Sequence, residues 1–189
     1  MVTHWGPSRR FRIWVAGGLI ASALGILGLW YAASSTGLPT LGVGSAAPGF
    51  SLPSLNGRMI SLSRLRGRAI LINFWAAWCP YCRAEATSLS SLESSCRRLT
   101  VLGVAVGARE AGVAAFANQM GIGYPELIDR NAAVAIRYGA TFLPTSVLVS
   151  PNGRIAWIDR GQFLSAGQAR SLVDQRLGGV CLPGRPAHG

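Results

Sequence analysis

Two cysteines separated by two residues are the part of the sequence best suited to chemistry. Cys79 and Cys82 lie in the stretch WAAWCPYC, residues 75–82, which follows an apolar run and opens a segment with helical spacing. The first turn of a helix has unpaired N–H groups and partial positive charge, and both stabilise a thiolate. Pro80 suits the first helical position, and Arg83 adds positive charge. Because a lower thiol pKa increases the thiolate fraction, we predict that Cys79 attacks disulfides and that Cys82 resolves the mixed disulfide.

The same pair has two other interpretations. A structural Cys79–Cys82 bond would close a very short loop and would remove little entropy from the unfolded chain. A zinc site needs about four ligands. The sequence has no second C-x-x-C motif, and its two histidines, His4 and His188, lie near the chain ends. The spacing therefore favours redox chemistry with no resident metal and no cofactor, while two thiolates could still bind Cu(I) in a carrier protein.

An apolar run without a charge occupies residues 13–33. At about 1.5 Å per residue, a helix of this length spans roughly 30 Å, the thickness of a bilayer core. Arginines precede the run within residues 1–12, and aromatic residues lie near both of its ends. By the positive-inside rule we predict a cytoplasmic basic segment at 1–12 and a transmembrane signal anchor at 13–33. A signal peptide cleaved at the small residues 32–34 is the alternative.

Composition excludes other classes of protein. Half of the residues are apolar and 13% are charged, which excludes a disordered chain. The net charge is +11, from 18 basic and 7 acidic residues, but the arginines are scattered rather than interleaved with aromatic residues, so we expect no nucleic-acid partner. Residues 34–48 are rich in Gly, Ser, Ala and Pro and predict a flexible tether, which leaves a folded domain at 49–178 and a tail at 179–189.

The pattern after the tether predicts an α/β domain. Nearly unbroken apolar runs suit strands that are buried on both faces, and alternation around Asn-Gly suits a hairpin with a type I′ turn. Ser165 is a plausible N-cap of the last helix. The expected elements are a hairpin at 50–62, strands at 69–74 and 100–106 joined by a helix with apolar positions at Leu89, Leu92, Cys96 and Leu99, helices at 110–120 and 132–138, a hairpin of strands at 145–149 and 154–158, and a helix ending near Leu177.

Several motifs together resemble a known family. They are the WAAWCPYC stretch, the PGFSL pattern at 48–52, FLPT at 142–145 and PNGRI at 151–155. This combination resembles the membrane-anchored TlpA/ResA/CcmG-like branch of the thioredoxin fold, over about residues 47–177. The resemblance implies an α/β thioredoxin fold with a central mixed sheet flanked by helices and an N-terminal β-hairpin extension, preceded by one transmembrane helix.

The resemblance also assigns roles to residues. Pro144 is expected to be cis and to face the cysteine pair, with Leu143 beside it offering backbone groups to an incoming peptide. Trp78, Pro80 and Tyr81 are expected to contact the substrate, although the tryptophan could equally fill the core. Glu85, three residues after Cys82, is expected to exchange a proton with that cysteine.

Some positions depart from the family pattern. The dipeptide Pro80-Tyr81 resembles that of glutaredoxins, and Thr145 stands where CcmG-like proteins carry an acid. Because of these two departures, the resemblance does not determine the substrate or the redox potential of the cysteine pair. Cys96 and Cys181 could form a disulfide, because the helices that carry them share a face in the resembled fold. A buried free Cys96 and a loose tail thiol are the alternative.

These features predict a thiol–disulfide oxidoreductase that reduces disulfides of secreted or periplasmic proteins, with apocytochrome c or oxidase assembly proteins as candidate substrates. The family resemblance implies a DsbD- or CcdA-like transmembrane electron donor. We expect a single-pass protein of the bacterial inner membrane with its catalytic domain in the periplasm. The alternatives are a DsbA-type oxidase on the same fold and the Cu(I) carrier.

Overall fold

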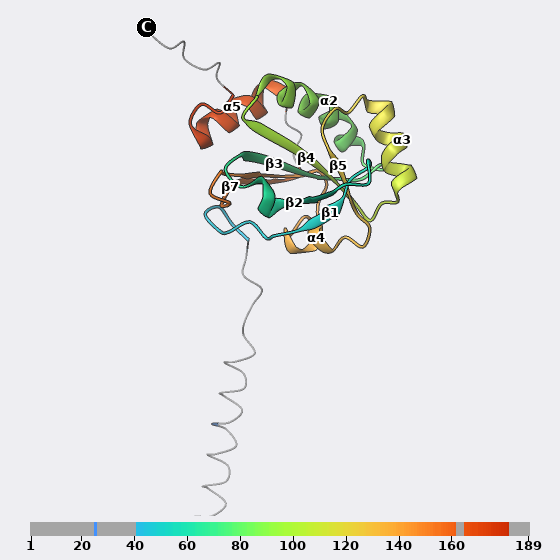
Figure 1. Cartoon of the computed structure of the whole chain (residues 1–189), viewed down its shortest axis with the longest axis horizontal. Helices are drawn as coiled ribbons and strands as arrows, with labels where there is room; N and C mark the ends of the chain where they lie inside the picture. The colour runs from blue at the N-terminus through green and yellow to red at the C-terminus, as the bar shows by residue number, and fades with distance from the viewer. Residues whose placement is uncertain (1–24, 26–40, 162–164, 182–189) are drawn as a thin grey trace, which may run out of the picture. The chain divides into compact units, whose positions relative to one another are not determined.

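A computed structural model describes residue 25 and residues 41–161 and 165–181 (Figure 1). Its centre is a five-stranded sheet in the order β5-β4-β3-β6-β7. The first three of these strands are parallel, and β6 and β7 are antiparallel to their neighbours in the sheet. The strands are β3 (Ala69–Trp75), β4 (Leu99–Val106), β5 (Glu126–Asp129), β6 (Thr145–Val149) and β7 (Ile155–Arg160), with β1 (Ser51–Pro53) and β2 (Met59–Ser61) in a separate small sheet.

Helices cover both faces of the central sheet (Figure 1). On one face α2 (Pro80–Ser95) and α5 (Ala166–Leu177) pack against Leu71, and α3 (Glu110–Met120) packs against Trp75. On the other face α4 (Ala133–Arg137) and the N-terminal segment pack against the remaining side chains of β3. All of β3 is buried because its alternate side chains point into these two layers.

Most of the expected elements are confirmed. The strand β6 and the helix α3 have the bounds that the sequence predicts, and β3 extends the predicted strand by one residue. Ser165 caps α5: its side chain accepts from the N–H of Gln168, whose side chain accepts from the Ser165 N–H in return. Gly178 ends the helix in the left-handed conformation, which a residue without Cβ adopts readily.

Three local predictions are wrong. The strand β5 was not expected, because its four buried residues include two acids and show no periodicity. Leu99 begins β4 instead of continuing the preceding helix. The β1–β2 turn is not type I′, which needs a positive φ at both central residues. Only Gly57 has one, and its N–H donates to the Ser54 carbonyl in a wider loop.

Residues 41–48 belong to the packed domain rather than to a flexible tether. The N–H groups of Gly44 and Ala47 donate to the carbonyls of Ile155 and Gly153, and Ala46 pairs with Arg154. The physical reason is that β7 is an edge strand, whose unpaired backbone groups accept a further segment. At the other end of the domain, Val180 and Cys181 of the predicted tail are buried.

The predicted anchor at 13–33 lies outside the described residues, apart from residue 25. In the described ranges, no helix has the length and apolar character needed to span a bilayer.

Candidate active site

Cys79 and Cys82 are joined by a disulfide at the start of α2. Cys79 is the N-cap, Pro80 occupies the first turn, and the N–H of Cys82 donates to the Cys79 sulfur at 3.2 Å. This bond uses one of the N–H groups that the first turn leaves without an intrahelical partner. The same N–H and the helix dipole would stabilise negative charge on Cys79 after reduction, as the sequence predicts.

A cis proline lies against the cysteine pair. The Leu143–Pro144 peptide bond is cis, and the Leu143 carbonyl oxygen lies 3.6 Å from the Cys79 sulfur. The preceding loop is held by Thr145, whose hydroxyl donates to the Phe142 carbonyl at 2.6 Å. The structure thus brings together two predicted site segments that are more than sixty residues apart in the sequence.

Exposed aromatic side chains occur in the two segments that carry the cysteines and the cis proline. Both cysteines are buried, whereas Trp78 and Tyr81 are 78% and 66% exposed. Phe142, beside the cis peptide bond, is 68% exposed, and the sequence analysis did not assign it a role. The position of Phe142 next to Leu143-Pro144 in the sequence could have indicated a place in the substrate-binding surface. Contiguous patches of exposed apolar side chains mark sites of contact with other proteins, and these three residues come from the two segments that meet at the Cys79 sulfur.

Glu85 is fully buried on α2, one turn after Cys82. The Asn73 side-chain amide donates to the Glu85 carboxylate at 2.7 Å and to the Ser146 hydroxyl at 3.0 Å. These hydrogen bonds orient the carboxylate within the apolar layer between α2 and the sheet. The proton-exchange role expected for Glu85 stays a prediction. Ser146 is a site residue that the sequence analysis missed, because its contact with Asn73 crosses from β6 to β3.

A second buried acid, Glu126, was also missed. The Trp75 indole N–H donates to its carboxylate at 2.6 Å, and its other oxygen is buried without a hydrogen-bond partner in the described structure. The carboxylate lies over Gly103 of β4, where a Cβ atom would collide with it. Burial raises the pKa of Glu126 to about 8, and the hydrogen bond from Trp75 opposes this only in part.

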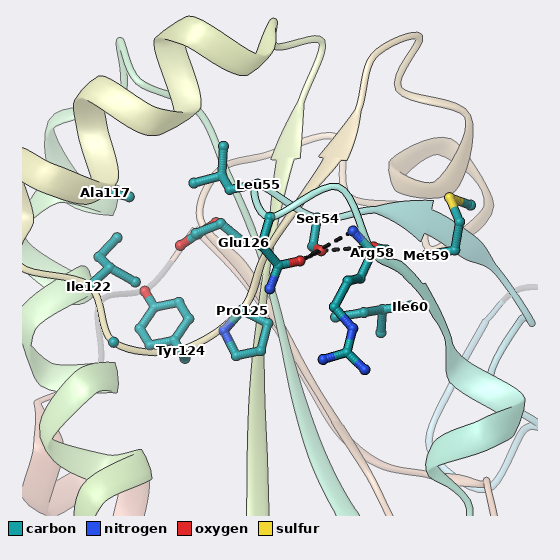
Figure 2. Close-up of a pocket in the computed structure, with 12 residues that line it drawn as sticks. Ser54, Leu55, Arg58, Met59, Ile60, Ala117, Ile122, Tyr124, Pro125 and Glu126 are labelled. Atoms are coloured by element: carbon teal, nitrogen blue, oxygen red, sulfur yellow. Dashed lines mark hydrogen bonds between the residues drawn. The ribbon is translucent and has the colours of Figure 1, made fainter.

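Glu126 also lines a pocket of about 490 Å³ between the β1–β2 loop and the segment that leads into β5. Figure 2 shows Glu126 between Leu55 and Tyr124, with Arg58 on the other side of the pocket. The loop is shaped by Ser54, whose hydroxyl donates to the Asn56 side chain and lies 2.7 Å from the Arg58 carbonyl oxygen. The pocket is separate from the cysteine pair, to which Glu126 is linked through Trp75.

Trp75 connects Glu126 to the active-site layer. Its ring stacks on Phe116 with centroids 4.0 Å apart, and it belongs to the same buried cluster as Cys79 and Cys82. The Arg83 guanidinium lies over the Phe116 ring, 5.6 Å from its centroid. Trp75 therefore fills the core, whereas Trp78 is exposed.

The remaining two cysteines form a second disulfide. Cys96, at the C-terminal end of α2, is bonded to Cys181, which follows α5. The bond ties together two helices that pack on the same face of the sheet. The Cys181 N–H also donates to the Asp174 carboxylate at 2.7 Å, so the end of the described chain is held firmly.

Among the described residues, no group of three or more His, Cys, Asp and Glu side chains is arranged to hold a metal ion.

The protein has a mixed sheet between two helical layers, a cysteine pair whose first member caps α2, and a cis proline that faces this pair. Together these features define a thioredoxin-fold dithiol–disulfide protein. Residues 43–158 match the model of the AhpC/TSA family. The chain is 35% identical over 145 residues to the thiol–disulfide oxidoreductase ResA of Geobacillus thermodenitrificans, covering 76% of this chain and 82% of the relative. It is 30% identical over 156 residues to ResA of Bacillus subtilis, covering 81% and 87%.

Solved structures agree with this assignment. A thiol:disulfide interchange protein DsbE from Chlorobium tepidum superimposes with a TM-score of 0.68 at 26% identity, covering 74% of this chain and all of the other. The chain belongs to the AhpC/TSA family and is a ResA-like thiol–disulfide oxidoreductase. The thioredoxin-like fold and the family that the sequence predicts are thereby confirmed.

Proposed function

We propose that this protein reduces disulfides in proteins outside the cytoplasm, while residues 13–33 hold it in the bacterial inner membrane. The observation that carries the proposal is the geometry of Cys79, which caps α2 and lies 3.6 Å from the Leu143 carbonyl beside the cis proline. A client strand that docks there would bring its own disulfide next to the sulfur. The ResA relatives support thiol–disulfide exchange as the reaction.

Reduction follows from two displacements. The Cys79 thiolate attacks one sulfur of the client disulfide; a mixed disulfide forms, and the other client sulfur leaves as a thiolate that takes up a proton. The Cys82 sulfur then attacks the Cys79 sulfur of the mixed disulfide. This leaves the Cys79–Cys82 disulfide and displaces the second client sulfur as a thiolate, which also takes up a proton. Two electrons and two protons pass to the client. Buried Glu85, held by the Asn73 amide, accepts the Cys82 proton as that sulfur becomes a nucleophile.

Client binding would use the exposed aromatic groups. Trp78, Tyr81 and Phe142 offer apolar surface, and the backbone at Leu143 offers hydrogen-bonding groups to an extended segment. Extended peptides bind such sites through main-chain hydrogen bonds, and side-chain pockets set the specificity. Pro80, exposed between the two cysteines, completes the contact surface.

The oxidised pair must be reduced again after each turnover. We propose a DsbD- or CcdA-like transmembrane protein as the electron donor, and apocytochrome c or oxidase assembly proteins as clients. Both proposals rest on the ResA and DsbE relatives and on the predicted anchor. Accumulation of adducts on a Cys82→Ala variant of the full chain would identify the clients, because the second displacement is blocked.

The direct test is insulin reduction by the full chain in detergent, with dithiothreitol as the reductant. We expect Cys79→Ser to abolish activity, whereas Ser94→Ala, an exposed position on the same helix, should leave it unchanged. Retained activity in Cys79→Ser would contradict the mechanism. A midpoint potential of the pair near −120 mV, rather than near the value of about −270 mV found in thioredoxin, would instead assign the protein as an oxidase.

The copper-carrier alternative has a separate test. Native mass spectrometry of the reduced chain after addition of Cu(I) would show one bound ion if the Cys79–Cys82 pair is a carrier site. An ion that is retained against a chelator of micromolar affinity, and lost in Cys79→Ser, would support the carrier, whereas no retained ion would exclude it.

A further inference from the structure

Exposed arginines gather at the end of the sheet opposite the cysteine pair. We call this group the basic end. Each of its side chains is exposed, and they come from the segment before β3, the segment before β4 and the turn between β6 and β7. Its members are Arg64, Arg66, Arg68, Arg97, Arg98 and Arg154.

Four arginines of the basic end line two adjoining hollows. Arg66 and Arg68 line one hollow together with Ser150 and Gly153. Arg68 also lines the neighbouring hollow of about 180 Å³, together with Arg97 and Arg98. The segment before β3 and the segment before β4, which are distant in the sequence, therefore present arginines to the same pair of adjoining hollows.

The hydrogen bonds of these arginines leave their charge available to a partner. Arg68 donates to the Thr100 hydroxyl at 2.9 Å, and Arg154 donates to the Gly44 carbonyl at 2.8 Å. Both acceptors are neutral. The acid whose charge interacts with Arg68 is Glu93, which is half-buried and cannot neutralise a group of this size.

The register of the sheet places the basic end and the active site far apart. Ala69 begins β3 beside the arginines, and Trp75 ends the same strand next to the cysteine loop. Seven residues of strand span roughly 20 Å at about 3.3 Å per residue. A partner bound at the basic end would therefore leave Cys79 accessible.

The chain also joins the domain at the basic end. The backbone of Gly44 and Ala47 pairs with β7 next to Arg154. In the sequence, residues 34–40 separate Leu41 from the apolar run at 13–33. Even fully extended, these seven residues reach about 25 Å. If the run is a membrane anchor, the basic end cannot move far from the bilayer surface.

We propose that the basic end binds anionic lipid headgroups and thereby orients the cysteine pair away from the bilayer. This inference rests on the proposed membrane anchor. Guanidinium groups pair well with phosphate oxygens, and each basic residue near an anionic surface contributes about fivefold in binding. Nucleic acid fits less well, because the exposed aromatic side chains of the described residues on which bases would stack, Trp78, Tyr81 and Phe142, lie in the active-site segments.

The test uses the full chain in nanodiscs, either of phosphatidylcholine alone or with phosphatidylglycerol added, and compares the reactivity of each arginine toward phenylglyoxal. We expect the arginines of the basic end to react about fivefold more slowly in the anionic discs, and high salt to remove the difference. Four exposed arginines outside the basic end should react equally in both discs. They lie after β4, after β5, on α4 and at the end of β7: Arg109, Arg130, Arg137 and Arg160.

Two matched variants make the test specific. Replacing Arg66, Arg68, Arg97 and Arg98 by glutamine should expose Arg64 and Arg154 to the reagent in anionic discs. Replacing the four control arginines by glutamine removes the same charge and should leave the basic end protected.

Three outcomes would overturn the proposal. Equal reactivity in the two kinds of disc would exclude lipid as the partner, as expected if an acidic protein or a nucleic acid binds instead. Equal protection of the control arginines would show an effect of net charge alone. A chain that does not enter nanodiscs would refute the anchor and this inference with it, whereas insulin reduction would still test the chemistry separately.

Discussion

Glu126 should make the stability of the protein depend on pH. Its pKa is raised from 4.5 to about 8 by burial, so the folded protein holds this proton to a higher pH than the unfolded chain does. The stabilisation is therefore complete below about pH 4.5 and is lost as the pH rises toward 8. At about 1.4 kcal/mol per pKa unit, the shift amounts to about 5 kcal/mol of unfolding free energy.

The measurement is urea unfolding of the full chain at pH 5 and at pH 8.5, with both disulfides intact. We expect the wild-type protein to lose several kcal/mol between the two pH values. Glu126→Gln keeps the size of the side chain and an oxygen for the Trp75 indole, but it cannot ionise. This variant should lose far less. A small loss would remain, because burial raises the pKa of Glu93 in the same direction.

The control is Glu110→Gln, which removes an exposed carboxylate from α3. This variant should keep the wild-type dependence on pH. If Glu126→Gln showed the same loss of stability as the wild type, the buried carboxyl would not be the cause and the reasoning would be refuted.

Three further substitutions test the packing around the site. Cys96→Ser opens a disulfide that closes 85 residues of sequence, and should lower the unfolding free energy by about 4 kcal/mol without abolishing insulin reduction. Asn73→Leu leaves Ser146 without the amide that donates to it and to Glu85, and should cost about 1–3 kcal/mol by urea unfolding. Gly103→Ala places a Cβ against the Glu126 carboxylate and should cost about 1–3 kcal/mol by the same measurement; an unchanged midpoint would contradict the close approach of this carboxylate to β4.

The elements that the sequence predicts well are those with strong local signals. The buried runs of β3 and β4 have the apolar composition of strands covered on both faces. Ser165 and Gln168 reveal the start of α5, because a capping box involves residues only three positions apart. The strand β5 lacks such a signal: it holds two acids among four residues, and its position depends on pairing with β4.

The active site also has parts that the sequence predicts from local signals and parts that it does not. The cysteine pair at the start of a helix is recognisable from its spacing, and the proline at 144 from its motif. The boundary of the domain was less accessible, since residues 41–48 have the composition of a linker. They are ordered by backbone hydrogen bonds with β7, to which composition gives no clue.

The amino-acid sequence alone determined the chemistry of this protein, because a helix-capping C-x-x-C motif depends on residues within one turn of each other. The tertiary structure alone decided which distant groups meet: Glu126 with Trp75, Ser146 with Asn73, and the arginines of the basic end. Strand order and register bring these groups together across 51 and 73 residues in the first two cases. Such contacts arise from the packing of the whole sheet and leave no periodic pattern in the chain.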